Sequence, residues 1–580
     1  MKKLEKSITG KGKKRVGIIG GGPSGLFMYK QLIESSTAFE IDIFEKKEQL
    51  GAGMPYSRDG SNSEHITNVS ANEIPTIVTS ICEWIKTAPK DLLQKFNIEL
   101  ERFTEYKILP RLFFGAYLSA QFDLLRDIAS HKRIITRLHT SAVIVDIMDN
   151  PNENVVRVEI ESGIIFEFDF VIICTGHRWP TKHEGIIPGY YDSPYPPSKL
   201  KLKLNHPVAI KGTSLTAIDA IRTLARHNGV FKTSKDGTVS YKLGDESPEF
   251  KFIMHSRHGF LPAIRFHLED SHLRNNAVLT PKEIEAHRAE NKGFLSLDFI
   301  FEKDFKQLLL QKEPEFYEQI KALTLEEFVT SMLELRERID AFQLFKAEYL
   351  EAEKSIKRKQ SIYWKEMLAV LSFAMNYPAK YLSAEDMQRL QKVLMPLISV
   401  VIAFVPQSSA KELLALHHAG IIDIIAVGSD STVHPEIQGG ITYTYTNDSS
   451  QISATYYKTF IDCSGQPHLS HKDFPFKSLL LEKRISPARL KFKSMEEGAK
   501  ALTCEGMDVE QDGNRDYYLH VPGITINDNF QIVDEYGAYN RRIYMMAVPY
   551  IAGFNPDYSG LDFCEAASAC IIKSLLNKNI

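Results

Sequence analysis

A short run near the start of the chain has the residue types and spacing of a phosphate-binding turn. Gly20, Gly22 and Gly25 follow the pattern G-x-G-x-x-G, and Pro23 and Ser24 lie between the last two glycines. In such a turn the first glycine permits a tight reversal, the second lets the backbone approach a pyrophosphate, and the third lets a helix pack closely on a strand. The run therefore predicts a dinucleotide site.

An acidic residue further along the chain indicates which dinucleotide the site prefers. Glu45 ends the apolar-rich run of residues 40–45, twenty positions after Gly25. A carboxylate there accepts hydrogen bonds from a ribose diol and repels a 2′-phosphate. The site is thus expected to take FAD or NAD rather than NADP. The neighbouring Lys46 and Gly53 are further candidates for contact with the cofactor.

The segments around these residues must place the turn between a strand and a helix. Residues 15–20 form a short apolar run that stops at glycines, which predicts a strand. Residues 23–34 carry apolar side chains at helical spacing, and residues 40–45 predict the next strand. The start of the helix then points its unpaired amides at the phosphates.

Length and charge limit the number of domains and the classes of partner that the chain can have. The 580 residues are 43% hydrophobic and 25% charged, enough for two or three domains with their own cores. The chain has 70 basic and 73 acidic residues, and a net charge of −3 gives no field that would attract nucleic acid. The longest apolar run, residues 393–406, has about 14 residues, short of the roughly 20 that a membrane helix needs. We therefore expect neither a nucleic-acid nor a membrane partner.

The six cysteines are widely spaced along the sequence except for the last two, and none forms a C-x-x-C pair. This spacing predicts no metal site and suits the reducing cytoplasm. It also argues against flavin disulfide reductases, which need two neighbouring redox-active cysteines.

Several segments resemble known flavoproteins. Residues 50–57 read Leu-Gly-Ala-Gly-Met-Pro-Tyr-Ser, residues 65–70 read His-Ile-Thr-Asn-Val-Ser, and the apolar run 169–176 ends in Thr175 and Gly176. Together with the glycine turn, these segments resemble the bacterial FAD-NAD(P)-binding proteins, a family similar in layout to flavin-containing monooxygenases and to ornithine and lysine N-hydroxylases. The resemblance implies an α/β fold in which a Rossmann-like FAD domain carries an inserted NAD(P)-binding domain, with Thr175 and Gly176 at the link.

A second turn, beginning at Gly212, resembles the second nucleotide motif of that family. Ser214 stands where the second glycine would be, and a side chain there limits the approach of backbone to a pyrophosphate. Arg257 follows the next apolar strand, where the family often places a cation for the 2′-phosphate of NADPH, and a guanidinium is well shaped for that contact. NADPH or NADH is therefore the expected second cofactor.

The C-terminal part is also similar to these flavoproteins. Residues 542–550 predict a last strand, and a loop then leads through Gly560 and Asp562 to a helix over residues 563–576. The resemblance implies that this loop and the start of the helix contact the flavin. Residues 459–467 repeat the pattern of the run that ends at Gly176, and we expect them to return the chain to the FAD domain.

Residues 280–405 differ from the rest, because glycine is nearly absent and apolar side chains recur at helical spacing. They predict a largely helical insertion. The expected domain order is an FAD domain over 1–200, an NAD(P) domain over 205–275, the helical insertion over 280–405, a return to the NAD(P) domain over 406–430, and the rest of the FAD domain over 431–580.

No catalytic acid, base or nucleophile is recognisable, which a flavin enzyme can tolerate because the cofactor carries the redox chemistry. His65 and Asn68 are the candidates for shaping the flavin surroundings, since their segment runs near the isoalloxazine in similar proteins; Tyr56, Tyr558 and Asp562 are weaker candidates. The resemblance implies an FAD-dependent oxidoreductase, foremost an NAD(P)H-dependent monooxygenase acting on a small molecule. A flavin dehydrogenase, reductase or oxidase that transfers no oxygen, and a non-catalytic FAD-binding regulatory protein, remain open.

Overall fold

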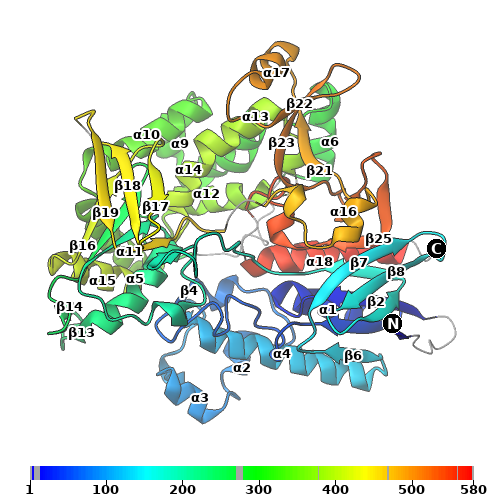
Figure 1. Cartoon of the computed structure of the whole chain (residues 1–580), viewed down its shortest axis with the longest axis horizontal. Coiled ribbons are helices and arrows are strands. Elements are labelled where there is room, and N and C mark those ends of the chain that lie inside the picture. The colour runs from blue at the N-terminus through cyan, green and yellow to red at the C-terminus, as the bar shows by residue number, and fades with distance from the viewer. Residues whose placement is uncertain are drawn as a thin grey trace.

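The chain folds into two α/β units and a helical region, which Figure 1 shows together. The structure, a computed structural model, describes residues 3–5, 13–268, 279–376, 378–447, 449–466, 469–557 and 560–577. The first unit comprises the described residues of 13–180 and 469–577. The second unit comprises residues 190–268 and the described residues of 407–466, and the helical region comprises the described residues of 281–401.

A six-stranded sheet forms the centre of the first unit, and only its outermost strand, β24, is antiparallel to its neighbour. β2 and β10 pair in parallel and are almost wholly buried and apolar, as expected for strands covered on both faces. The strands are, in spatial order, β24 (Gln531–Val533), β25 (Tyr539–Met545), β10 (Phe170–Ile173), β2 (Lys14–Ile19), β3 (Phe39–Phe44) and β6 (Thr136–His139).

Helices and smaller sheets cover this central sheet. Helix α1 packs on β2 and β3 and is flanked by α4 and α18, whereas the Phe168 ring at the end of β9 lies against Gly17 of β2. The helices of this unit are α1 (Pro23–Glu34), α2 (Ile81–Trp84), α3 (Lys90–Lys95), α4 (Arg111–His131), α16 (Lys477–Leu481), α17 (Met495–Leu502) and α18 (Gly560–Asn577). The remaining strands are β1 (Lys3–Glu5), β4 (Ile66–Ser70), β5 (Ile108–Pro110), β7 (Ile144–Asn150), β8 (Val155–Ile160), β9 (Ile164–Phe168), β21 (Pro487–Lys491), β22 (Val509–Gln511) and β23 (Tyr517–Ile524).

The second unit has a five-stranded, wholly parallel sheet of its own. Its strands are, in spatial order, β11 (Tyr190–Tyr191), β20 (Thr459–Asp462), β12 (Pro207–Lys211), β15 (Lys251–Ser256) and β16 (Ile422–Ala426). A three-stranded meander packs on it, and the Tyr443 ring stacks on His255 with centroids 4.1 Å apart. The covering elements are α5 (Leu215–Asn228), β13 (Gly229–Thr233), β14 (Val239–Leu243), α15 (Gln407–His418), β17 (Thr432–Pro435), β18 (Ile441–Thr446) and β19 (Ile452–Tyr457).

The two units repeat one topology. In the first, the strand before the glycine turn is followed by two further strands on one side, a meander, and then a strand that returns to the other side: β2, β3, β6, β7 to β9, β10. In the second, the same order is β12, β15, β16, β17 to β19, β20. The helical region lies within the connection from β15 to β16.

This repeat corrects one expectation from the sequence. Residues 459–467 were expected to return the chain to the first unit, but β20 pairs in parallel with β12 and β11 of the second. The expected boundaries at residues 200 and 430 therefore both fall inside the second unit. A strand of only four residues carries no local information about its partner strands, so the similarity of β20 to β10 marked a repeated position rather than a return.

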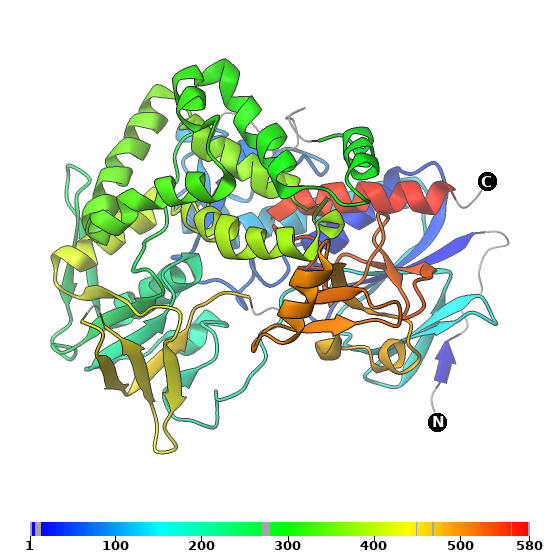
Figure 2. The same cartoon turned by 90° about the horizontal axis from the view of Figure 1, so that it is seen from above.

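The helical region confirms the predicted helical insertion, and it lies across the top of the molecule in Figure 2 (green). Most of its buried apolar residues join those of the first unit in one continuous core, whereas those of α11, which packs on α15, belong to the core of the second unit. No helix of the described residues is long and apolar enough to cross a membrane. The helices are α6 (Pro281–Glu290), α7 (Leu297–Phe301), α8 (Gln307–Lys312), α9 (Pro314–Ile320), α10 (Leu325–Arg338), α11 (Ala341–Arg358), α12 (Tyr363–Ala374), α13 (Ala384–Arg389) and α14 (Met395–Val401).

Candidate dinucleotide sites and the seam between the units

The glycine turn of the first unit lies between β2 and α1, at the carboxyl end of the parallel sheet. Gly20 has φ +112°, and a Cβ there would lie 2.6 Å from the carbonyl oxygen of Cys174, which follows β10. A Cβ at Gly25 would lie 2.1 Å from the Gly20 carbonyl oxygen, so the helix can approach the strand only because this residue has no side chain. Gly22 faces Gly53, which brings that predicted contact residue to the turn.

Helix α1 begins directly at the turn with the features of an anion-binding terminus. Gly22 is its N-cap and Pro23 its first residue, and no side chain of the described residues caps it. The amides of the first turn are thus left for a ligand, and the positive end of the helix dipole favours a phosphate there. Ser24 contacts Cys564 of α18 through its hydroxyl, at 3.4 Å, so the two helix starts lie side by side.

The acid predicted for the ribose lies beside the turn. One carboxylate oxygen of Glu45 accepts the Gly21 amide at 2.8 Å, and the other accepts the Lys47 amide at 3.1 Å. These bonds hold the half-buried carboxylate at the end of β3, next to the glycines. The side chain of Lys46 points into solvent.

Two oxygen atoms near the turn are buried without a hydrogen-bond partner among the described residues. They are Oγ1 of Thr175, directly after β10, and Oδ1 of Asp562, in the first turn of α18. Burial and the nearby carboxylates of Glu73 and Asp557 raise the pKa of Asp562 to about 7. Buried polar atoms in proteins are nearly always satisfied, so these two oxygens are free to bond to a polar ligand held at the turn. Gly176 has open space around its Cα.

These features fit a bound FAD. The glycines leave room for a pyrophosphate, the start of α1 offers amides to it, and Glu45 is placed for a ribose. Thr175 and Asp562 offer the two unsatisfied oxygens, and Gly560 begins the helix that carries Asp562. Tyr558, another candidate, lies outside the described residues.

The second turn repeats the first, with Ser214 in place of the second glycine. Gly212 has φ +106°, and a Cβ there would lie 2.8 Å from the carbonyl oxygen of Cys463, which follows β20. Ser214 is the N-cap of α5 with extended backbone, and its side chain is exposed. Arg257 follows β15 directly and is exposed, with no ion pair to any described residue. The guanidinium is thus available at the same end of the sheet as Gly212.

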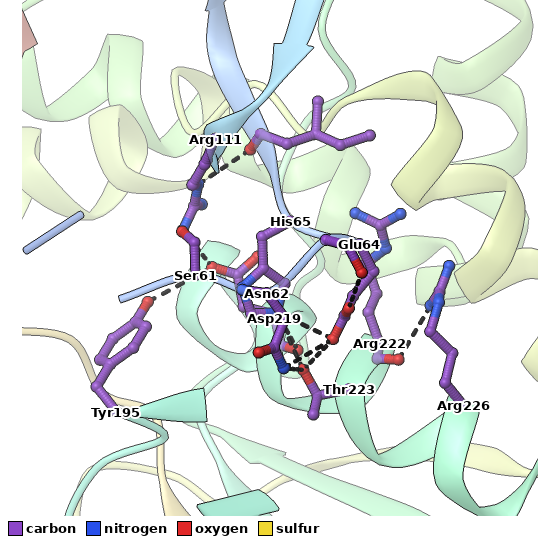
Figure 3. A network of polar contacts seen from close by, with 12 residues as sticks. Ser61, Asn62, Glu64, His65, Arg111, Tyr195, Asp219, Arg222, Thr223 and Arg226 are labelled. Carbon is purple, nitrogen blue, oxygen red and sulfur yellow. Dashed lines mark hydrogen bonds and ion pairs between the residues drawn. The ribbon is translucent and has the colours of Figure 1, made fainter. Parts of the chain in front are cut away.

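His65 lies at the seam where the first unit meets α5 of the second, as Figure 3 shows. It is fully buried, its Nδ1 accepts the Asn62 amide at 3.1 Å, and its Nε2 lies 3.2 Å from the Asp219 carbonyl and 3.1 Å from the Thr223 hydroxyl. This pattern assigns the proton to Nε2. Burial lowers the pKa of His65, so the ring is neutral. Its ring nitrogens are engaged with the protein.

An ion pair that the sequence did not single out joins the units next to His65. Arg111, the first residue of α4, donates from Nη1 to Oδ2 of Asp219 at 2.6 Å and from Nε to the Ile66 carbonyl at 3.1 Å. Asp219 also keeps the pKa of Arg111 above its usual range, although burial alone would lower it. The available signal was an acid inside the apolar run of residues 217–221.

A second buried ion pair crosses between the units near Asn68. Arg265, on the segment after β15, pairs with Glu73 and donates to the hydroxyl of Ser70 at 2.8 Å. It also donates to the carbonyl oxygen of Asn68, so this candidate contributes backbone rather than side chain to the contact. Glu73 is in turn one of the carboxylates that raise the pKa of Asp562. Glu73 of the seam thus lies within electrostatic range of the first turn of α18.

Comparison with known proteins gives two family matches. Residues 17–178 match the family described as FAD-NAD(P)-binding, and residues 280–402 match the family described as YdhS-like middle domain. The first match covers the first glycine turn, Glu45 and Thr175-Gly176. It confirms the predicted resemblance, the Rossmann-type α/β fold and the cofactor class.

Individual relatives are similar over most of the chain. The uncharacterized protein YdhS of Escherichia coli K12 is 28% identical over 473 residues, which cover 80% of this chain and 86% of that protein. Among solved structures, the ornithine N-hydroxylase KtzI of Kutzneria sp. 744 is 12% identical, with a TM-score of 0.46 over 98% of this chain and 100% of that one. DfoA, the cadaverine monooxygenase of Erwinia amylovora, is 10% identical, with a TM-score of 0.47 over 97% and 95%.

Proposed function

Because residues 17–178 match the FAD-NAD(P)-binding family, we propose that this chain is an FAD-dependent oxidoreductase that takes electrons from NAD(P)H and acts on a small molecule as a monooxygenase. The observation that carries the proposal is the repeated topology. Each unit has a glycine turn with positive φ, at Gly20 and Gly212, packed against the carbonyl after a returning strand. Two such turns in one chain suit two dinucleotides.

The first unit holds FAD in this proposal. Bound FAD supplies two-electron redox chemistry, and the protein supplies binding, orientation and electrostatics. The start of α1 would bind the pyrophosphate, and Glu45 would accept from the ribose with the lone pairs that its bonds to the Gly21 and Lys47 amides leave free. The start of α18 would stabilise negative charge on a flavin bound beside it, and Asp562, when protonated, would offer a hydrogen-bond donor there.

The second unit binds the nicotinamide cofactor in this proposal. Arg257 contacts a 2′-phosphate, which favours NADPH over NADH. His65 and Arg265 are buried, so their side chains keep water out of the seam where the two units meet. His65 and Asn68 act there as structural residues, since their contacts are with the protein.

Ser214 favours one alternative. A side chain at this place narrows the approach to a pyrophosphate, which suits a flavin dehydrogenase or oxidase whose electrons come from the substrate. The six cysteines are all free, which fits a reducing compartment such as the cytoplasm for either activity.

The test begins with the visible spectrum of the purified protein and anaerobic mixing with NADPH or NADH. Bleaching of the flavin by NADPH supports the proposal, and oxygen uptake without equivalent hydrogen peroxide in the presence of small amines or ketones supports monooxygenation. Bleaching by such a substrate, and not by nucleotide, favours the alternative. Protein that stays colourless after reconstitution with FAD would overturn both.

A further inference from the structure

The seam between the units is built from buried polar contacts on one short stretch of α5. Asp219 and Thr223 lie one helical turn apart, and both face residues of the first unit (Figure 3). The Arg111 and Asp219 side chains are only 15% and 7% exposed. Thr223 donates to Oε1 of Glu64 at 2.7 Å and accepts from His65. Side chains of both units therefore take part in the hydrogen bonds of the seam.

This stretch lies close to the second nucleotide turn. Asp219 is five residues after the N-cap Ser214, within the second turn of the helix that begins at the proposed NAD(P)H site. On the first unit, the Arg111 amide donates to the His65 carbonyl at 2.9 Å, which ties α4 to the strand β4. The contacts therefore connect α4 and β4 of the first unit to α5, the helix that begins at the second nucleotide turn.

Buried polar contacts of this kind set geometry more than stability. Burying two charges costs hydration free energy, and their mutual attraction offsets only part of that cost. A protein with a well-packed apolar pair of similar size at the same place is therefore often as stable. An ion pair with directed hydrogen bonds, however, admits few relative orientations of α4 and α5. The guanidinium of Arg111 donates to the Ile66 carbonyl and to Asp219 at the same time. These two bonds fix the angle between α4 and α5 as well as the distance between them.

We propose that Arg111, Asp219 and His65 are positioning residues that hold the two nucleotide-binding units in one relative orientation and thereby set the rate at which NAD(P)H reduces FAD. This inference rests on the proposed function. A hydride carries two electrons and a proton from the nicotinamide, which is oxidised, to the flavin, which is reduced. Such a transfer requires reacting atoms about 3–3.5 Å apart, and a shift of about 1 Å can cost about 100-fold in rate.

A matched control lies on the same helix. Arg222 and Arg226 of α5 pair with Glu412 of α15, at 2.7 and 2.6 Å, and the Glu412 side chain is 13% exposed. This buried ion pair stays within the second unit. Glu412→Gln thus removes a comparable contact without touching the seam.

The experiment compares Asp219→Asn, Thr223→Val and Glu412→Gln with the native chain. We expect Asp219→Asn to keep its FAD, to be reduced by NADPH about 10-fold or more slowly, and to be reduced by dithionite at the native rate, because dithionite needs no nucleotide site. Thr223→Val should show a smaller change of the same kind. Glu412→Gln should lower the melting temperature and leave the NADPH-to-dithionite rate ratio unchanged.

Hydrogen–deuterium exchange of the FAD-free proteins gives a readout that is independent of activity. Faster exchange over residues 61–66 and the first half of α5 in both seam variants, and not in Glu412→Gln, supports the inference. Native exchange there in Asp219→Asn and Thr223→Val, or an unchanged rate ratio, would overturn it. A native protein that NADPH and NADH both fail to reduce would instead refute the proposed function, and the exchange data would still decide whether the seam holds the units together.

Discussion

At the scale of single residues, Gly20 offers a direct test of the first site. At Gly20, φ is +112°, and a Cβ would lie 2.6 Å from the carbonyl oxygen of Cys174. That oxygen belongs to the backbone and cannot swing aside, so any side chain at this position is strongly disfavoured. We expect Gly20→Ala to weaken FAD binding by about 100-fold or more, since the turn must open by a large part of an ångström. Equilibrium titration with FAD, followed by flavin fluorescence, measures this.

Gly513→Ala is the control for this substitution. Gly513 lies in a turn of the first unit, has no positive φ, and has no atom within 4 Å of a built Cβ. Its FAD affinity and melting temperature should match those of the native chain. Native FAD affinity in Gly20→Ala would show that the cofactor does not depend on this turn.

Arg257 offers the corresponding test of the second site. Its exposed guanidinium has no ion pair within the described part of the chain, so its removal should cost little stability. We expect Arg257→Ala to raise KM for NADPH by about 10- to 100-fold, the worth of charge-assisted hydrogen bonds to a phosphate, and to leave KM for NADH unchanged. Steady-state kinetics with both nucleotides check this. An equal effect on NADH would place Arg257 outside the 2′-phosphate contact.

At the scale of elements, the first turn of α18 makes stability depend on pH. The pKa of Asp562 is raised to about 7 by burial and by Glu73 and Asp557, whereas the unfolded chain loses this proton near its ordinary value of 3.8. Between these values the native state holds more protons than the unfolded state, so Asp562 makes stability fall as pH rises from about 4 to about 7.

Asp562→Asn should remove this dependence. In FAD-free protein we expect the variant to melt a few degrees above the native chain at pH 8, with the difference shrinking toward pH 5, where native Asp562 is protonated. Differential scanning fluorimetry across this range measures it. A difference that stays constant with pH would contradict the raised pKa.

At the scale of the whole molecule, the helical region shares a core with the first unit although it is inserted in the second. Phe305 is fully buried in this shared core, whereas Phe250 belongs to the core of the second unit. Phe305→Ala should lower the free energy of unfolding by about 3–5 kcal/mol and lower the temperature at which bound FAD is released. Phe250→Ala should destabilise similarly with less effect on FAD release. Flavin fluorescence during heating separates the two outcomes.

The sequence by itself determined the parts that depend on short-range chemistry. Gly20, Gly25 and Gly212 were recognisable because a tight turn beside a carbonyl excludes a side chain wherever it occurs. Glu45 was recognisable because it follows the strand after α1, and the end of that strand lies beside the turn. The helical region was recognisable because its apolar side chains recur at the helix period. Each signal lies within a few tens of residues.

Only the tertiary structure decided which distant segments meet. β20 resembled β10, yet it joins β12 of the second sheet, and the helical region shares most of its core with the unit in which it is not inserted. Arg111 and Asp219, 108 residues apart, form the seam. Such pairings are chosen by competition among all buried surfaces of the folded chain, so no local pattern of charge or hydrophobicity specifies them.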